Sequence, residues 1–337
     1  MTLQIIWFVL IGVLFAGYAL FDGFDLGVGM LHPFLAKNDE EKRVIRTSIG
    51  PVWDGNEVWL LTAGGAMFAA FPPVYATVFS GFYLALMLVL FSLIFRAVSF
   101  EFRHHDPAWA SLWDGAFFVG SALPSLLFGV AAGNIIRGIP LDKAGEFTGD
   151  FFTLLNPFSL VMGVLGLTMF LVQGSAWLAV KTGGDLHGRA VATRGLMQKV
   201  FAGVVVLATI ATYALVPRAF SAVVGNVLGI VFVVLLLVAL VWGFVAARGG
   251  RDLHAWYAAS LSAVALVGMW AVSIFPAMVP AINDEALSLT IYNSSSSQLT
   301  LTVMLIIAAI GVPIVLFYTA LVYKVFHGKV QLGGDGY

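Results

Sequence analysis

The chain has 337 residues, 60% of them hydrophobic and only 10% charged, with a formal net charge of −1. Soluble proteins average about 25% charged residues, so this composition excludes a soluble domain, and a chain without a basic excess is not expected to bind nucleic acid. The chain has no cysteine, which excludes disulfides, thiolate metal sites and cysteine nucleophiles. We therefore expect an all-α integral membrane protein that forms one polytopic domain over residues 1–337.

The opening segment MTLQIIWFVL has neither a basic region nor a small-residue cleavage site, so we expect it to start a retained helix. A helix needs about 20 apolar residues to cross a membrane. Nine stretches meet this need: roughly 4–31, 53–71, 75–98, 113–136, 155–180, 200–217, 226–247, 254–276 and 300–325. Pro72 and Pro217 end the second and sixth, and Pro313 predicts a kink in the ninth. Short connections predict two four-helix bundles plus one peripheral helix.

Nine spans place the two termini on opposite sides of the membrane. The loops at 32–52, 99–112, 181–199 and 248–253 then share a side with the C-terminal tail. With the adjoining span ends, that side carries fourteen basic residues: Lys37, Lys42, Arg43, Arg46, Arg96, Arg103, Lys181, Arg189, Arg194, Lys199, Arg248, Arg251, Lys324 and Lys329. The other side has three: Arg137, Lys143 and Arg218. Because basic loops stay in the cytoplasm, we predict a cytoplasmic C-terminus and an external N-terminus.

Four acids stand beside long apolar runs. Asp22 and Asp25 fall in the cytoplasmic third of the first span, and Asp54 and Glu57 open the second span on the same side. A charged side chain at the membrane centre costs about 2.5–3.5 kcal/mol on insertion scales, so acids kept there usually have a function. Asp114 opens the fourth span at the same depth. We interpret these carboxylates as the lining of a proton route.

Structural roles are the alternative for each acid. Asp54 and Glu57 have the spacing of a helix-capping box, and Asp114 has the position of a simple N-cap. Asp22 and Asp25 lie inside a span and cannot cap it. Their structural alternative is a buried ion pair with Arg96 or Arg103.

An arginine and two tryptophans near the acids are candidate ligand-binding groups. Arg96 ends the third span, where it can hold an acid, a quinone or a lipid head group, or extend to the membrane surface. Trp53 and Trp59 flank the acids and fit an aromatic belt.

The six histidines lie in loops or at span ends: His32, His104, His105, His187, His254 and His327. None has the mid-span position of a haem ligand, so we predict no haem and no metal in this chain. His104 and His105 beside Asp106 are the one arrangement that suits a metal, and solvated loop histidines are the alternative.

Four segments carry a resemblance to subunit II of cytochrome bd-type quinol oxidases, including the cyanide-insensitive branch. They are GYALFDGFDLGVGML at 17–31, SIGPVWDGNEVWL and its continuation to 103, LWDGAFFVGSALPSLLFGVAAGN at 112–134, and IYNSSSSQLTLTVMLIIAAIGVPIVLFYT at 291–319. The resemblance covers nearly the whole chain, and the first two motifs are long and specific.

This resemblance implies a respiratory-chain role in the bacterial inner membrane. The family oxidises quinol and reduces oxygen to water, with two b haems and one d haem in a homologous subunit I. Subunit II has nine spans and no haem, stabilises subunit I, and in some members holds a structural quinone. A small single-span accessory subunit and bound lipid are further expected partners.

Family motifs also assign roles to single residues. A proton path from the cytoplasm uses acids of subunit II, and the matching positions here are Asp22 and Asp54. Asp25, Glu57 and Trp53 belong to the same motifs and are assigned secondary roles. Glu57 stands where some relatives have glutamine, so we do not expect it to be essential. For cofactor contact, Trp53 and Arg96 are the candidates for a quinone or a lipid.

Two other functions remain open from the sequence. A proton-coupled transporter also needs intramembrane acids and glycine-rich helices, although such carriers usually place them near mid-membrane. A purely structural membrane partner would use the same acids as caps and buried ion pairs. Activity of carboxylate variants would separate these readings.

Overall fold

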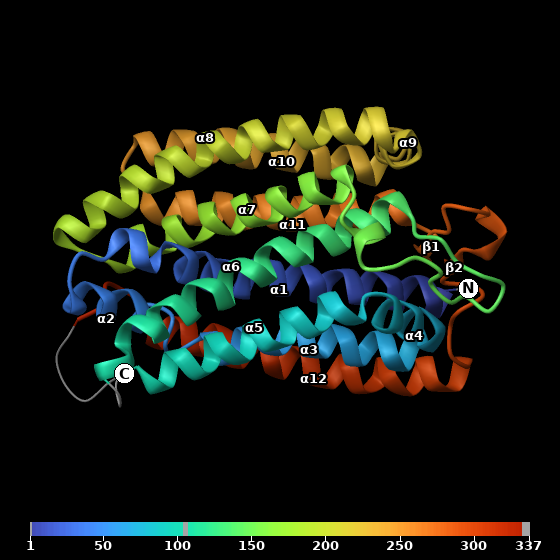
Figure 1. The fold of residues 1–337 in the computed structure, drawn as a ribbon, viewed down its shortest axis with the longest axis horizontal. Coiled ribbons are helices and arrows are strands. Elements are labelled where there is room, and N and C mark those ends of the chain that lie inside the picture. Colours follow the sequence, from blue (N-terminus) through green and yellow to red (C-terminus); the bar gives the residue numbers. More distant parts are fainter. Residues whose placement is uncertain (1, 104–106, 332–337) are drawn as a thin grey trace.

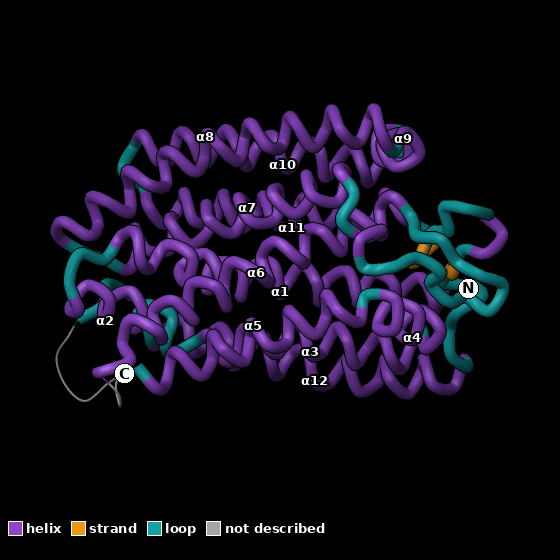
Figure 2. Tube along the Cα trace, viewed as in Figure 1, coloured by secondary structure: helices purple, strands orange, loops and turns teal. Residues whose placement is uncertain are grey.

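A computed structural model describes residues 2–103 and 107–331 of the chain. Twelve α-helices make up nearly all of the regular structure in these ranges (Figure 2). They are α1 (Thr2–Leu35), α2 (Asp39–Thr47), α3 (Trp53–Ala70), α4 (Pro72–Gly81), α5 (Tyr83–Phe102), α6 (Ala110–Arg137), α7 (Pro157–Lys181), α8 (Gly184–Leu215), α9 (Pro217–Val224), α10 (Val227–Arg248), α11 (Asp252–Ile274) and α12 (Gln298–Val325). Short 3-10 helices are η1 (Pro107–Trp109), η2 (Phe152–Leu154) and η3 (Glu285–Leu287).

Eight helices in the described part of the chain are long and apolar enough to cross a membrane: α1, α5, α6, α7, α8, α10, α11 and α12. Each overlaps one of the predicted spans. The remaining predicted span, 53–71, is helix α3, whose 18 residues include Asp54, Asn56 and Glu57 in the first turns. That polar start sets α3 apart from the eight apolar helices, although it packs against α1 like them.

The long helices fall into two groups of four that follow one another along the chain, as the sequence predicts (Figure 1). One group contains α1, α3, α5 and α6, and the other contains α7, α8, α10 and α11. Helix α1 packs against both groups, because it contacts α3 and α6 as well as α7 and α11. Helix α12 lies on the outer edge beside α1 and α3, and Leu301 is its one buried residue. It is the peripheral helix.

Three boundaries differ from the prediction. The stretch 75–98 is two helices, since α4 ends at Gly81 and only α5 crosses, so the span begins at Tyr83. The predicted loop 181–199 is helical from Gly184 onward, which makes α8 a helix of 32 residues. The loop 32–52 contains α2.

Local sequence explains where the helices begin. The side chains of Asn38, Asn156 and Asn226 accept hydrogen bonds from backbone N–H groups at the starts of α2, α7 and α10, because an exposed first turn leaves N–H groups without helical partners. Proline stands in the first turn of α4, α7 and α9, where its missing N–H costs nothing. By contrast, Pro313 lies inside α12, which continues to Val325 as one helix.

The start of α1 and the end of α12 lie at opposite ends of the molecule (Figure 1), as an odd number of crossings requires. At the first end, Trp7 donates a hydrogen bond to the Leu301 carbonyl at the start of α12. The short strands β1 (Ala277–Val279) and β2 (Leu289–Thr290) pair antiparallel there. At the second end, the Val330 N–H bonds to the carbonyl of Lys181, where α7 ends. Helix α2 lies at this second end.

Candidate functional site

A buried ion pair joins α1 to α5. Both terminal nitrogens of Arg96 contact the carboxylate of Asp22, Nη2 at 2.9 Å from Oδ1 and Nη1 at 3.2 Å from Oδ2. Asp22 is fully buried and Arg96 is 1% exposed. Such a two-pronged arrangement is the strong form of an arginine–carboxylate pair. Arg96 therefore holds an acid in the interior of the helix group and does not extend to the membrane surface.

Glu57 of α3 extends this pair toward the outside of the helix group. Its Oε1 lies 3.2 Å from Arg96 Nη1, and its side chain is 22% exposed. Asp54, three residues earlier on the same helix, is exposed. Carboxylates thus run from the exposed Asp54 through the half-buried Glu57 to the fully buried Asp22. We call Asp22, Glu57 and Arg96 the inner triad.

Asp25 is also fully buried but has different neighbours. Its Oδ2 accepts a hydrogen bond of 2.7 Å from Asn56 Nδ2 of α3. The amide oxygen of Asn56 accepts a 3.1 Å hydrogen bond from the hydroxyl of Tyr323, on α12. Within the described residues, Asp25 Oδ1 has no hydrogen-bond partner. The two acids of the FDGFD motif therefore differ, since Asp22 has a cation within hydrogen-bonding distance and Asp25 has none.

Close helix contact brings these groups together. Gly27 of α1 crosses Gly174 of α7 so tightly that a Cβ on Gly27 would lie 2.8 Å from the Gly174 Cα. Gly17 accommodates the indole of Trp59 in the same way. Trp59 is 8% exposed and stacks on Phe21, so it belongs to the interior and not to an aromatic belt. Trp53 is half-buried against Phe100.

A second charged group lies nearer the α2 end of the molecule. Asp114 of α6 accepts hydrogen bonds from Arg103 Nε at 2.5 Å and from Lys42 Nζ at 2.8 Å. Arg46 Nη1 and His32 Nε2 are 3.5 Å and 3.8 Å from Asp114 Oδ1. Helices α1, α2 and α6 and the end of α5 each contribute to it. We call these five residues the rim cluster: His32, Lys42, Arg46, Arg103 and Asp114.

Electrostatics at the rim cluster follow from burial and pairing. A hydrogen bond from Arg103 lowers the pKa of the exposed Asp39 carboxyl below 3.8. Burial, with Arg103 close by, lowers the pKa of Arg46 to about 10. Burial acts to lower the pKa of Arg103 as well, but its hydrogen bonds to Asp114 and Asp39 outweigh that effect and raise the pKa.

The sequence prediction of five acids at one depth is wrong for Asp114. That residue belongs to the rim cluster, apart from the inner triad, and its ion pairs replace the predicted N-cap, because α6 already begins at Ala110. Asp54 is not an N-cap either, since Val52 holds that position without a side-chain hydrogen bond. Arg103 pairs with Asp114 and Asp39, and among the described residues Arg96 is the cation that pairs with the FDGFD motif.

Sequence reasoning missed Asn56, Tyr323 and the burial of His32. Asn56 lies between Asp54 and Glu57 in the sequence, but an amide carries no charge that marks it as functional. Tyr323 is 267 residues away from Asn56, so the sequence gives no sign that the two side chains meet. His32 lies in the last turn of α1, at a span end as predicted, but its complete burial is not evident from the sequence. The predicted alternative metal group at His104, His105 and Asp106 lies outside the described residues.

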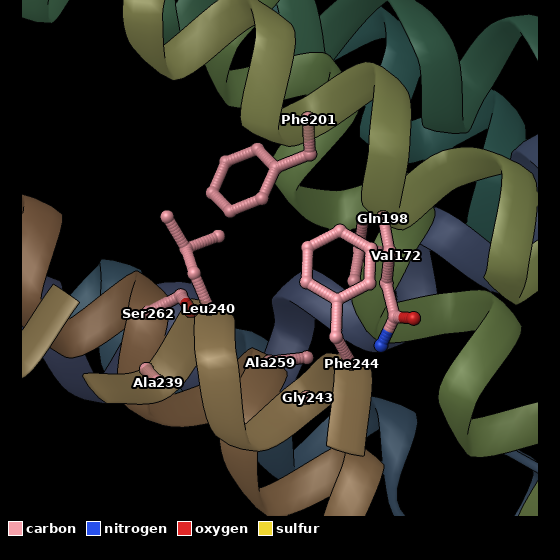
Figure 3. A pocket seen from close by; sticks show the side chains of 9 residues that line it. All are labelled: Val172, Gln198, Phe201, Ala239, Leu240, Gly243, Phe244, Ala259 and Ser262. Carbon is pink, nitrogen blue, oxygen red and sulfur yellow. The ribbon is translucent and has the colours of Figure 1, made fainter. Parts of the chain in front are cut away.

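One small pocket opens between α7, α8, α10 and α11. It has about 20 Å³ of free space, room for about one water molecule, and is lined mainly by apolar side chains. Figure 3 shows the rings of Phe201 and Phe244 around the space with Leu240, and the amide of Gln198 beside them. The Gln198 amide oxygen is buried and has no hydrogen-bond partner in the described ranges. The space is too small for a ring or a hydrocarbon chain, and none of its lining residues belongs to the inner triad.

Comparison with known proteins gives consistent results. A family model described as cytochrome bd terminal oxidase subunit II matches residues 3–326. The chain is 40% identical, over 368 aligned residues, to cytochrome bd-I ubiquinol oxidase subunit 2 of Escherichia coli strain K12, covering 98% of this chain and 95% of that protein. It is 36% identical to cytochrome bd ubiquinol oxidase subunit 2 of Bacillus subtilis strain 168, covering 98% and 97%.

The fold has a counterpart among solved structures. A chain in the structure of bd oxidase from Geobacillus thermodenitrificans matches with a TM-score of 0.82, covering 97% of this chain and 99% of that one. Their sequence identity is 17%, so this likeness concerns the fold. Together with the family match over almost the whole length and the two relatives above, it leads to one conclusion: the chain belongs to the cytochrome bd terminal oxidase subunit II family.

Proposed function

We propose that this chain is the haem-free subunit of a quinol:oxygen oxidoreductase, and that it supplies a proton-uptake path from the cytoplasm. The reaction converts quinol and oxygen to quinone and water at haems held by the partner, subunit I. This chain carries no complete active site of its own. The observation that supports the proposal is the graded line of carboxylates from the exposed Asp54 through Glu57 to the buried Asp22.

Each acid has a role that follows from its surroundings. Asp54 collects protons at the exposed end, and Glu57 passes them inward beside Arg96. The positive charge of Arg96 holds Asp22 in place, whereas Asp25 has only the neutral Asn56 amide as a hydrogen-bond donor. A carboxyl group without a counter-ion can take up and release a proton with little change in its ion pairs. We assign Asp25 as a carrier and Asp22 as the partner that completes the inner end of the path.

The partner subunit is proposed to cover the face formed by α3, α5 and α12. On α3, exposed residues recur at helical spacing along one stripe: Asp54, Val58, Leu61, Gly65 and Phe68. Nearly all of α12 is exposed as well. A charged residue is costly where it faces lipid, and Asp54 on this stripe is better accommodated against protein or water. Covering the face would place subunit I at the outer end of the carboxylate line and stabilise both chains.

The chain is placed as a multi-pass protein of the bacterial inner membrane with α2 on the cytoplasmic side. The end that carries α2 also carries the predicted excess of Lys and Arg. In this orientation the rim cluster faces the cytoplasm, and the β1–β2 end faces outward with the N-terminus.

For cofactors, the proposal assigns the two b haems and the d haem to subunit I. A structural quinone stays a proposed cofactor without an assigned pocket, because the space beside Phe201 and Phe244 has room for about one water molecule. Arg96 is a poor candidate for a quinone or lipid ligand, because both its terminal nitrogens already contact carboxylates. Trp53 stays a candidate contact on the exposed side. Lipid and a small single-span subunit remain proposed partners.

The test compares Asp22→Asn and Asp54→Asn in the assembled complex. We expect oxygen consumption to fall about tenfold or more in Asp22→Asn, in line with the usual contribution of a positioned proton-transfer group, and less in Asp54→Asn. The matched control is Asp185→Asn, an exposed acid at the same end of the molecule on α8. Haem spectra of the purified complex report assembly.

Each outcome separates the alternatives. Unchanged turnover in both variants, with full assembly, would refute the proton path and favour a structural partner whose Asp22–Arg96 pair serves stability alone. Proton-coupled uptake of a solute by the isolated chain in liposomes would instead favour a transporter. Loss of turnover with normal haem content in Asp22→Asn supports the proposed function.

A further inference from the structure

We propose that His32 relays protons between Asp114 of the rim cluster and Asp25 in the interior. The inference rests on the proposed function and adds a second branch to it, from the α2 end along α1. The observation that motivates it is a buried histidine whose two ring nitrogens both lack a hydrogen bond among the described residues.

The position of His32 on α1 is the first support. Asp25, Gly29 and His32 are separated by four and three residues, which places them on one face of the helix. Seven residues of helix span about 10 Å, or about two turns, so His32 and Asp25 lie along one line of α1 with Gly29 between them. The inner triad begins on the same face at Asp22, three residues before Asp25.

A buried hydroxyl stands in the gap between the two groups. Ser121 of α6 packs directly against Gly29, whose missing side chain leaves room for the hydroxyl. Ser121 is fully buried, and its hydroxyl donates to the Phe117 carbonyl. In the relay the hydroxyl rotates away from that carbonyl, accepts a proton from the His32 side and releases its own proton toward Asp25. Gly29 is thus the point where a polar atom reaches the α1 face between His32 and Asp25.

The rim cluster connects the other side of His32 to the exterior. His32 Nε2 lies 3.8 Å from Asp114 Oδ1, which is too long for a direct hydrogen bond and fits a bridging water. Asp114 in turn binds Lys42, which is 28% exposed, and shares Arg103 with the exposed Asp39.

Arg46 is the second unsatisfied group at this place. Its guanidinium is 4% exposed, and none of its three nitrogens makes a hydrogen bond within the described ranges. Buried polar groups in proteins are nearly always satisfied by protein or water. Two such groups beside one carboxylate point to ordered water at the rim cluster, which would carry protons from Asp114 to His32.

The charged groups that face His32 are Asp114 on α6, Lys42 and Arg46 on α2, and Arg103 at the end of α5. A neutral imidazole can relay a proton in this setting, because it accepts a proton on one ring nitrogen while it releases the proton from the other. The step moves one proton, leaves the ring neutral, and involves no electron transfer. Phe117 packs edge-on against the ring and holds it in place.

The experiment uses the assembled oxidase with His32→Gln and, separately, Ser121→Ala. We expect turnover to fall about tenfold in His32→Gln and several-fold in Ser121→Ala, because each removes one link of a proton-transfer chain. The solvent isotope effect on turnover should rise in both, and the pH profile should change. The control is His327→Gln, an exposed histidine after the end of α12.

The result that would overturn the relay is wild-type turnover, pH profile and isotope effect in both variants with normal haem content. Should His32→Gln fail to assemble, Ser121→Ala decides alone, since it removes only one oxygen. Failure of the relay is distinguishable from failure of the proposed function. Slow turnover in Asp22→Asn with normal His32→Gln and Ser121→Ala removes this branch alone, whereas normal turnover in all three removes the path itself.

Discussion

At the scale of single residues, the inner triad depends on one arginine. Arg96 contacts two carboxylates from two other helices while it is almost fully buried. A buried ion pair contributes little net stability over an apolar pair, but removing one member leaves the other charged and unpaired. The triad therefore holds α1, α3 and α5 at a fixed spacing, and its loss should be costly.

We predict that Arg96→Gln lowers the stability of the chain by about 3–5 kcal/mol, the usual cost of breaking a buried pair. Thermal unfolding in detergent measures the change. The double variant Asp22→Asn with Arg96→Gln should recover a large part of the loss, because no unpaired charge from this pair remains. Strictly additive effects of the two substitutions would contradict a coupled pair.

At the scale of helices, the crossing of α1 and α7 decides the position of the FDGFD motif. Gly27 and Gly174 let the two backbones touch, which is how small residues act in membrane helices. Gly27 lies two residues after Asp25, so any displacement here also shifts the acids.

Gly27→Ala is expected to destabilise the fold by about 1–3 kcal/mol, because an added Cβ would collide with backbone atoms of α7 that cannot move away easily. Gly12→Ala on the same helix is the matched control, since nothing lies within 4 Å of the added atom. Thermal unfolding of the two variants gives the comparison. Equal behaviour of both would show that the α1–α7 contact is looser than described.

Helix α2 is held to the bundle by ion pairs that depend on pH. The hydrogen bond from Arg103 lowers the pKa of Asp39 below 3.8. For Glu41, burial acts to raise the pKa, but hydrogen bonds from the Lys37 backbone and Arg189 outweigh it and lower the pKa below 4.5. Because folding lowers these values, the ion pairs stabilise α2 at pH above 3.8 and 4.5, and the effect is lost as the pH falls through the lowered values.

We expect hydrogen exchange in α2 to accelerate when the pH is reduced from 6 to about 3.5, after correction for the intrinsic pH dependence of exchange. In Asp39→Asn and Glu41→Gln combined, the additional acceleration should be smaller, because the titrating groups are gone. An unchanged acid response in that variant would mean that other groups control α2.

At the scale of the whole molecule, the absence of cysteine makes orientation directly measurable. Glu40, exposed on α2, and Asp284, exposed beyond β1, lie at opposite ends. We predict that an impermeant maleimide added to intact cells labels Asp284→Cys and not Glu40→Cys. Inverted membrane vesicles should give the reverse pattern, and labelling of both sites from one side would refute the proposed topology.

Much of this protein could be predicted from its sequence. Apolar runs of about 20 residues can satisfy their backbone hydrogen bonds in lipid only as helices, so the crossings and their order were evident. The FDGFD and PVWDGNE motifs were sufficient to predict the family. Helix α4 and the early start of α8 were missed, because hydropathy marks where a chain enters lipid and not where a helix begins.

Tertiary structure alone decided which polar groups meet. Asp22 and Asp25 share one face of α1, yet Asp22 forms an ion pair with Arg96 of α5, whereas Asp25 accepts a hydrogen bond from Asn56 of α3. The sequence places Asp114 at the same depth as these two acids, but in the fold it pairs with Lys42 of α2 and belongs to the rim cluster. Such pairings depend on the rotation of each helix about its axis and on the contacts at glycines such as Gly27. Hydrophobic length fixes neither quantity, because every side of a buried membrane helix is apolar to a similar degree.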